Sequence, residues 1–105
     1  MELKAMQQMI HNFTTEKGIN TEVSVRMLDL VSEVGELSKE ILIGANYGTR
    51  KLDISEGFKS EVGDILFSLI CLANEAEVDL EESLIIVLEK YKKRFINKGH
   101  IGSEK

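Results

Sequence analysis

The chain has 105 residues, 43% of them hydrophobic, and a formal net charge of −5, which predicts one small globular domain spanning residues 1–105. The acidic balance argues against a nucleic-acid-binding function, and the short apolar runs argue against a membrane-spanning helix. A single cysteine, Cys71, excludes an internal disulfide, and together with the lack of a signal-like first segment it indicates a cytoplasmic protein.

Along the chain, apolar residues recur with a period near 3.6, which is typical of amphipathic helices. The chain has no proline, so the breaks between helices must come from glycine, asparagine, aspartate and polar clusters. These breaks divide the chain into four predicted helices, at about residues 2–15, 22–45, 55–77 and 79–98. Asp79 and Glu82 have the spacing of a capping box at the start of the last helix, and a polar tail is expected at about 99–105.

The short connections between these helices predict an all-α fold, an antiparallel four-helix bundle. The third predicted helix is apolar on nearly every side, and from Val62 to Ala76 it carries no basic residue. A helix of this kind is normally buried in a larger core than one chain of 105 residues can supply. We therefore expect a homo-oligomer, either a homodimer or a homotetramer.

Two closely similar pentapeptides lie in the second and third predicted helices, SEVGE and SEVGD. Each places two carboxylates three residues apart, and residues at this spacing project from one side of a helix. The acids are Glu33 and Glu36 in the first copy, and Glu61 and Asp64 in the second. If the two helices pack antiparallel, the two pairs can meet near the interior of the bundle.

Four carboxylates brought together without cations would repel one another and would lose hydration. Divalent metal ions relieve both problems, and an all-oxygen ligand set suits Mg²⁺, or Mn²⁺ as a substitute, better than zinc. Gly35 and Gly63 lie between the acids of each pair and indicate either a close helix approach or room for a ligand. The histidines, His11 and His100, lie outside both acidic helices, so a di-iron site of the Glu-x-x-His type is not expected.

The same acids also have a purely structural interpretation. An E-x-x-E pair on a helix is usually a solvated face, and Ser60 could be an N-cap with Glu61 and Asp64 interacting favourably with the helix dipole. The matching glycines and the lack of a cationic partner in the third helix favour the metal site.

These residues resemble the signature of the MazG-like family of all-α nucleoside triphosphate pyrophosphohydrolases, which reads E-E-x-x-E, a spacer and E-x-x-D. The resemblance covers about residues 22–95, which would form the catalytic core of a MazG-like domain. One position departs from the signature, because its first glutamate is Ser32 here. If that glutamate orients water in some relatives, this chain must use another group, such as Glu40, one turn beyond Glu36.

The resemblance implies hydrolysis of the α–β phosphoanhydride of an NTP or dNTP to the monophosphate and pyrophosphate, in a house-cleaning or nucleotide-pool role. It implies that four acids bind Mg²⁺ and act in catalysis: Glu33, Glu36, Glu61 and Asp64. One of them would also be the general base, for which we choose Glu36.

Contacts to the substrate outside the metal site are expected from two places. Lys90 and Arg94 are one turn apart on the fourth predicted helix, where the family carries a comparable basic motif, and the resemblance implies that they contact phosphate. The alternative is that they only complement the helix dipole. Asn74 matches a polar position of the family that implies a contact to sugar or base, and otherwise it is a polar residue in the last turn of its helix.

Two other functions stay open at this stage. A sister activity of the superfamily, phosphoribosyl-ATP pyrophosphohydrolysis, would use the same helices and the same metal site. A non-enzymatic helical module would instead dimerise or bind a partner through the apolar third helix, and it would need no metal.

Overall fold

A computed structural model describes residues 1–102, which form four helices and no strand. The helices are α1 (Leu3–Lys17), α2 (Val23–Gly44), α3 (Glu56–Glu75) and α4 (Leu80–Lys98). The all-α prediction is confirmed, and each predicted helix has its counterpart in the structure. Of the predicted tail, residues 103–105 lie outside the described part of the chain.

The helix ends are fixed by local polar groups that the sequence supplies. The Ser55 hydroxyl accepts a hydrogen bond from the Phe58 N–H at the start of α3, and the Asp79 carboxylate accepts one from the Glu82 N–H at the start of α4. Such N-caps satisfy amide groups that have no partner inside the helix. The Asp79 cap was predicted, whereas the suggestion that Ser60 is an N-cap was wrong, because α3 begins at Glu56 and Ser60 lies inside it.

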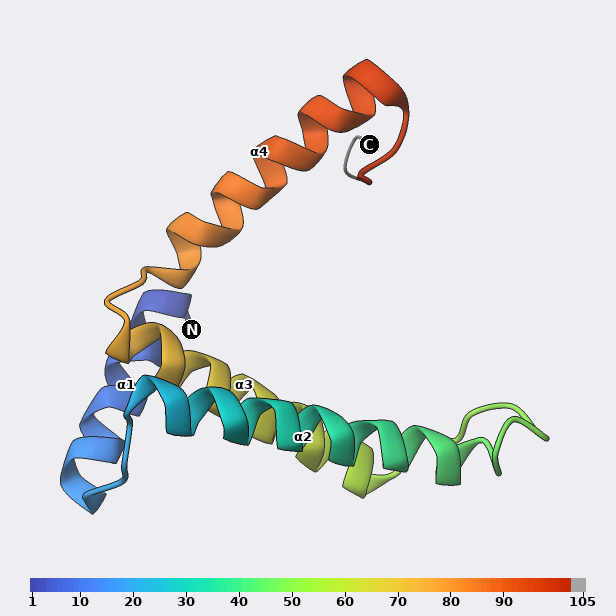
Figure 1. The fold of residues 1–105 in the computed structure, drawn as a ribbon, viewed down its shortest axis with the longest axis horizontal. Coiled ribbons are helices and arrows are strands. Elements are labelled where there is room, and N and C mark those ends of the chain that lie inside the picture. Colours follow the sequence, from blue (N-terminus) through green and yellow to red (C-terminus); the bar gives the residue numbers. More distant parts are fainter. Residues whose placement is uncertain (103–105) are drawn as a thin grey trace.

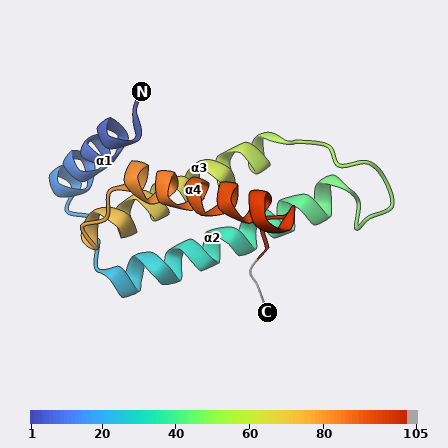
Figure 2. The same ribbon diagram turned by 90° about the horizontal axis from the view of Figure 1, so that it is seen from above.

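Helices α2 and α3 form a long antiparallel hairpin, which Figures 1 and 2 show from two sides. Its loop is closed where the Asp53 N–H donates to the Gly44 carbonyl at 3.0 Å. A Cβ atom on Gly44 would lie 2.7 Å from the Asp53 carbonyl oxygen and 2.9 Å from Leu52 Cδ1. Only glycine therefore allows the end of α2 to meet its loop this closely.

Of the two interpretations of Gly35 and Gly63, the close helix approach is wrong within the chain, and room for a ligand stays a prediction. At Gly35 and at Gly63 a Cβ atom would meet nothing within 4 Å, so neither glycine marks a close approach of helices within the chain. The close approach of α2 to α3 lies instead at Gly57, where a Cβ atom would come within 2.8–3.0 Å of the Glu40 carboxylate.

The core lies in the C-terminal half of α3, where α1 crosses the α2–α3 hairpin. Ile70, Cys71 and Ala73 are buried there. Part of the apolar third helix is therefore covered within one chain. Phe13 of α1 packs edge-on against Phe67 of α3, with ring centroids 6.2 Å apart, a favoured aromatic geometry.

The first turn of α4 is held at the corner between α1 and α3. The Gln7 side chain donates to the Val78 carbonyl at 2.9 Å and accepts from the Leu80 N–H at 3.0 Å. Beyond this corner α4 projects away from the hairpin, as Figure 1 shows. Residues 1–102 contain no helix with the length and apolarity that a membrane crossing requires.

This arrangement makes the single chain unusually open. Its radius of gyration is 16.9 Å, whereas a compact domain of this length has about 13 Å. Its accessible surface is 7728 Å², whereas a compact monomer of this mass exposes about 5,900 Å². Much of the excess is apolar, because large side chains on the outer side of α2 and along α4 stay exposed, among them Leu28, Val31, Ile86 and Phe95.

Candidate active site

The seam between α2 and α3 is lined by polar contacts along most of its length. The Ser68 hydroxyl donates to Asp29 Oδ2 at 2.7 Å near one end, and the Ser55 hydroxyl donates to Glu40 Oε2 at 3.3 Å near the other. Antiparallel packing thus turns a polar stripe of α2 towards α3. Carboxylates on this stripe are placed opposite carboxylates of α3.

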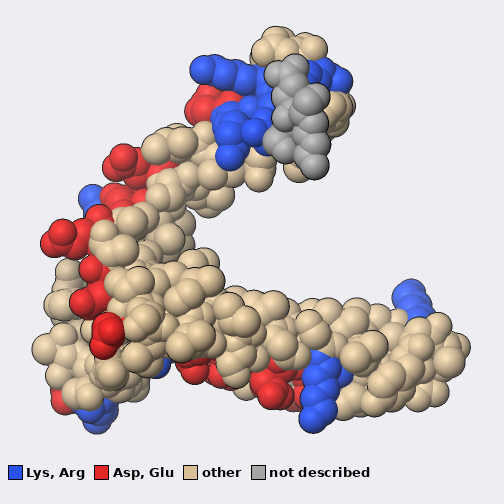
Figure 3. All heavy atoms as spheres, in the orientation of Figure 1, with Lys and Arg blue, Asp and Glu red and all other residues tan. Residues whose placement is uncertain are grey.

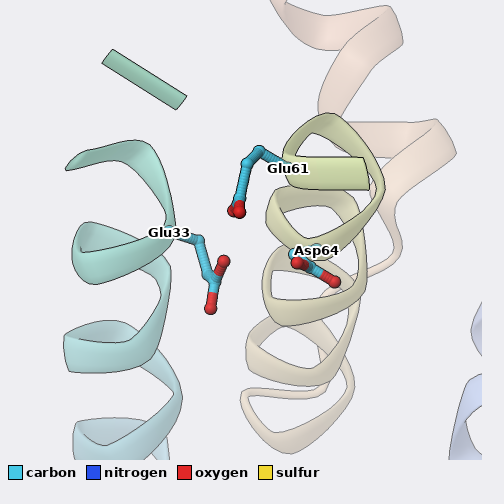
Figure 4. Close-up of side chains that lie close together, drawn as sticks. All are labelled: Glu33, Glu61 and Asp64. Atoms are coloured by element: carbon cyan, nitrogen blue, oxygen red, sulfur yellow. The ribbon is translucent and has the colours of Figure 1, made fainter. Parts of the chain in front are cut away.

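Between these two contacts, three carboxylates converge. Glu33 from α2 and Glu61 and Asp64 from α3 each offer an oxygen atom, and the three oxygens lie within 4.8 Å of one another. Figure 4 shows Glu33 directed at the two acids across the seam. Glu33 and Glu61 are half-buried, and Asp64 is exposed, so the cluster opens to solvent on one side.

The crowding of negative charge changes the protonation of Glu33. A hydrogen bond shared with Glu61, partial burial, and the charges of Glu61, Asp64 and Asp29 together raise the pKa of Glu33 to about 7. Two carboxylates this close cannot both ionise without cost, so Glu33 is still partly protonated near neutral pH. A cation in the cluster would remove this cost.

The cluster fits a hard divalent cation. Within the described residues, Glu61 Oε2 is inaccessible to solvent and has no hydrogen-bond partner, although a buried carboxylate oxygen normally has one. A divalent ion between the helices would satisfy it. All donors are carboxylate oxygens, the set that Mg²⁺ and Mn²⁺ prefer.

The other acids considered from the sequence lie outside this group. Glu36 is exposed and is not part of this group, which holds three of the four predicted acids. The Glu40 carboxylate lies over Gly57 and accepts from the Ser55 hydroxyl. Its place is the N-terminal turn of α3, where a negative charge is favourable, and not the cluster.

The predicted cations are not brought to the acids within one chain. Lys90 and Arg94 lie on α4, and their charged groups are 5.4 Å and 5.9 Å from the ring centroid of Tyr91 between them. Arg94 also donates to the Ile101 carbonyl at 2.8 Å. Figure 3 shows basic side chains gathered on the outer half of α4, far from the hairpin.

The predicted contact residue Asn74 has partners of its own. Its Nδ2 donates to the Gln7 carbonyl at 2.9 Å, and its Oδ1 accepts from Gln7 Nε2 at 3.0 Å. Asn74 also borders a cavity of about 130 Å³ that His11 and Cys71 line between α1 and α3. These contacts give Asn74 a structural role in joining α1 to α3, and its predicted contact to the substrate stays a prediction.

Sequence reasoning missed the polar group next to the acids. Arg26 Nη1 lies 3.5 Å from Asp29 Oδ2, the oxygen that also accepts from Ser68. The signal was present, because Asp29 precedes Glu33 by one helical turn and Ser68 follows Asp64 by one turn. A serine in an apolar helix and a single arginine, however, do not predict a polar contact until it is known which helices pack together.

Comparisons with known proteins show the family of the chain. Residues 22–97 match the model of the MazG nucleotide pyrophosphohydrolase domain. An uncharacterised protein of Bacillus subtilis (strain 168), YpjD, is 39% identical over 71 residues, which cover 65% of this chain and only 62% of YpjD. The crystal structure of the Bacillus-conserved MazG protein, a nucleotide pyrophosphohydrolase, matches with a TM-score of 0.72 at 30% identity, covering 87% of this chain and 90% of that one.

Proposed function

Because the chain belongs to the MazG nucleotide pyrophosphohydrolase family, we propose that it hydrolyses the α–β phosphoanhydride of an NTP or dNTP. The products would be the monophosphate and pyrophosphate, and the role would be house-cleaning or control of the nucleotide pool. The observation that carries the proposal is the convergence of Glu33, Glu61 and Asp64 across the α2–α3 seam, in the part of the chain that matches the family.

We propose that these three acids hold Mg²⁺, for which Mn²⁺ would substitute. When bound, the ion would neutralise charge on the triphosphate and lower the pKa of a water molecule. Near neutral pH the proton that Glu33 partly retains must leave before the ion binds, so Glu33 would couple metal binding to pH.

Glu36 is the best placed of the predicted acids to be the general base. It lies one turn from Glu33 and outside the three-acid group, so its exposed carboxylate is free to accept a proton. The oxygen of a water molecule would form a bond to phosphorus while the bond to the bridging oxygen breaks. The proton would pass to Glu36, and pyrophosphate would leave.

The phosphate-binding cations would come from a second copy of the chain. In one chain α4 carries Lys90 and Arg94 away from the acids (Figure 1), and the apolar outer side of α2 and much of α4 are uncovered. A homodimer, or a homotetramer built from it, would cover these surfaces and could place α4 of one copy near the acids of the other. Two-fold association is the commonest way for a chain to do so.

The test is an analysis of products from a panel of NTPs and dNTPs, including damaged ones, incubated with the purified protein and Mg²⁺. The proposal predicts monophosphate and pyrophosphate in equal amounts. Nucleoside diphosphate with orthophosphate would instead show cleavage at the β–γ bond and would contradict it.

Two alternatives have their own outcomes in this panel. Phosphoribosyl-ATP, added as one further substrate, would be the only compound cleaved if the sister activity is the true one. A non-enzymatic module would cleave nothing, and a non-hydrolysable nucleotide with Mg²⁺ would leave its thermal stability unchanged. A true ligand at 100 times its Kd would add about 2.7 kcal/mol.

A further inference from the structure

We propose that Arg26, Asp29 and Ser68 form a positioning network that holds α2 and α3 at the spacing at which Glu33 meets Glu61 and Asp64. None of the three is a predicted metal ligand or substrate contact. The inference rests on the proposed function, because it assigns the network a role in forming the metal site.

The position of the network is the first argument. Asp29 lies four residues before Glu33 on α2, and Ser68 lies four residues after Asp64 on α3. Their hydrogen bond is therefore about 6 Å from the cluster along both helices. Since it joins the same two helices as the acids, any separation of the helices at the cluster must stretch it.

The burial of the network is the second argument. Ser68 is 1% exposed, so a small shift of α2 would break its bond to Asp29 without admitting water, and an unpaired buried donor is costly. The Arg26 side chain is 12% exposed and lies between Asp29 and the buried Cys71. The Ser68–Asp29 hydrogen bond joins the two helices, whereas the Arg26–Asp29 ion pair lies within α2 and holds the Asp29 carboxylate in place for Ser68.

The charge at the seam is the third argument. Without a metal, the cluster has three carboxylates and Asp29 adds a fourth, and their repulsion favours separation of α2 from α3. Arg26 offsets part of this negative charge, because its guanidinium group lies 3.5 Å from the Asp29 carboxylate. The network thus opposes the separation that the metal-free acids favour.

Mn²⁺ binding to the full-length protein tests the network without any substrate. Free Mn²⁺ is measured by electron paramagnetic resonance at a temperature where each variant is shown by circular dichroism to be folded. Ser68→Ala removes the hydroxyl without changing charge and should weaken Mn²⁺ binding by about threefold to tenfold, less than the effect of losing a group bonded directly to a ligand. Asp29→Asn should weaken Mn²⁺ binding by a similar factor. The double variant should bind Mn²⁺ only slightly less tightly than the single variant with the lower affinity.

Two controls separate positioning from general effects. Thr14→Val removes another buried hydroxyl, which donates to the His11 carbonyl away from the seam, and should leave Mn²⁺ binding unchanged even if it lowers stability. Glu75→Gln removes a negative charge at the far end of α3, where the carboxylate accepts from Thr21, and controls for the charge lost in Asp29→Asn.

The outcomes separate this inference from the proposed function. Wild-type affinity in both Ser68→Ala and Asp29→Asn would overturn the network while leaving the metal site intact. If Ser68→Ala does not fold, Asp29→Asn compared with Glu75→Gln decides the matter. Failure of the wild-type protein itself to bind Mn²⁺ would overturn the metal site and the network together.

Discussion

At the scale of single residues, the chemistry centres on Glu33, the carboxylate that α2 contributes to a cluster otherwise built on α3. Its hydrogen bond with Glu61 and the nearby charges raise its pKa to about 7. If the cluster binds a metal ion as proposed, the protonation of Glu33 would differ between the metal-free and the metal-bound protein, and the two forms would respond differently to pH.

The metal-free protein should lose stability as pH rises through the range set by Glu33. Below about pH 4.5 both folded and unfolded chains hold the proton, and between 4.5 and about 7 only the folded chain does. The free energy of unfolding contributed by this group therefore falls across that window, and the loss is complete above it. Urea unfolding in a chelator, at about pH 5 and about pH 8, should show this loss in the wild type and not in Glu33→Gln. Equal pH dependence in the two proteins would contradict the assignment.

Glu36→Gln distinguishes a general base from a metal ligand. Because Glu36 lies outside the three-acid group, the variant should bind Mn²⁺ as the wild type does. Its kcat should fall by about a hundredfold or more. Loss of Mn²⁺ affinity in this variant would show that Glu36 is a ligand, as the sequence alone had also allowed.

At the scale of helices, the polar seam explains why α2 and α3 pack as they do. Periodicity was enough to predict four helices, and the repeated pentapeptides were enough to select three acids that do converge. The role of each glycine was not predictable, because it depends on what lies opposite. Gly35 and Gly63 face open space, whereas Gly44 and Gly57 are crowded by Asp53 and Glu40.

Gly44→Ala should destabilise the protein although alanine favours helix. A methyl group there would meet the Asp53 carbonyl oxygen at 2.7 Å, and forced overpacking of this kind costs about 1–3 kcal/mol, more than the gain of about 1 kcal/mol in helix propensity. The matched control is Gly63→Ala, whose methyl group meets nothing within 4 Å and which should gain up to about 1 kcal/mol. Chemical unfolding of the two variants measures both values, and a more stable Gly44→Ala protein would contradict the packing.

At the scale of the whole molecule, the open shape is the main feature that the sequence predicted only indirectly. The apolar third helix indicated that one chain cannot cover its own core, but not that α4 would project from the corner near Gln7. Periodicity shows which face of a helix is apolar, but not which other helix, in the same chain or in a second copy, would cover that face. For the same reason, the sequence could not place Lys90 and Arg94 relative to the acids.

Mixed dimers test whether a site is shared between copies. Subunits carrying Glu61→Gln and subunits carrying Arg94→Ala would be co-expressed with different tags, and the heterodimer would be isolated with both tags. If α4 serves the acids of the partner, one of the two sites is intact and the heterodimer should regain roughly half of the wild-type activity. If each chain serves its own acids, both sites are damaged and the heterodimer should be as inactive as either parent.

The most direct test of the proposed metal-dependent centre is the rate of pyrophosphate release with Mg²⁺ from the best substrate, comparing Glu61→Gln with Glu40→Gln. Both changes remove one half-buried carboxylate from the same seam, but only Glu61 belongs to the three-acid group. We predict that Glu61→Gln abolishes Mg²⁺-dependent release and that Glu40→Gln retains most of it. Full activity in Glu61→Gln, or equal losses in both variants, would contradict a catalytic centre built on these three acids.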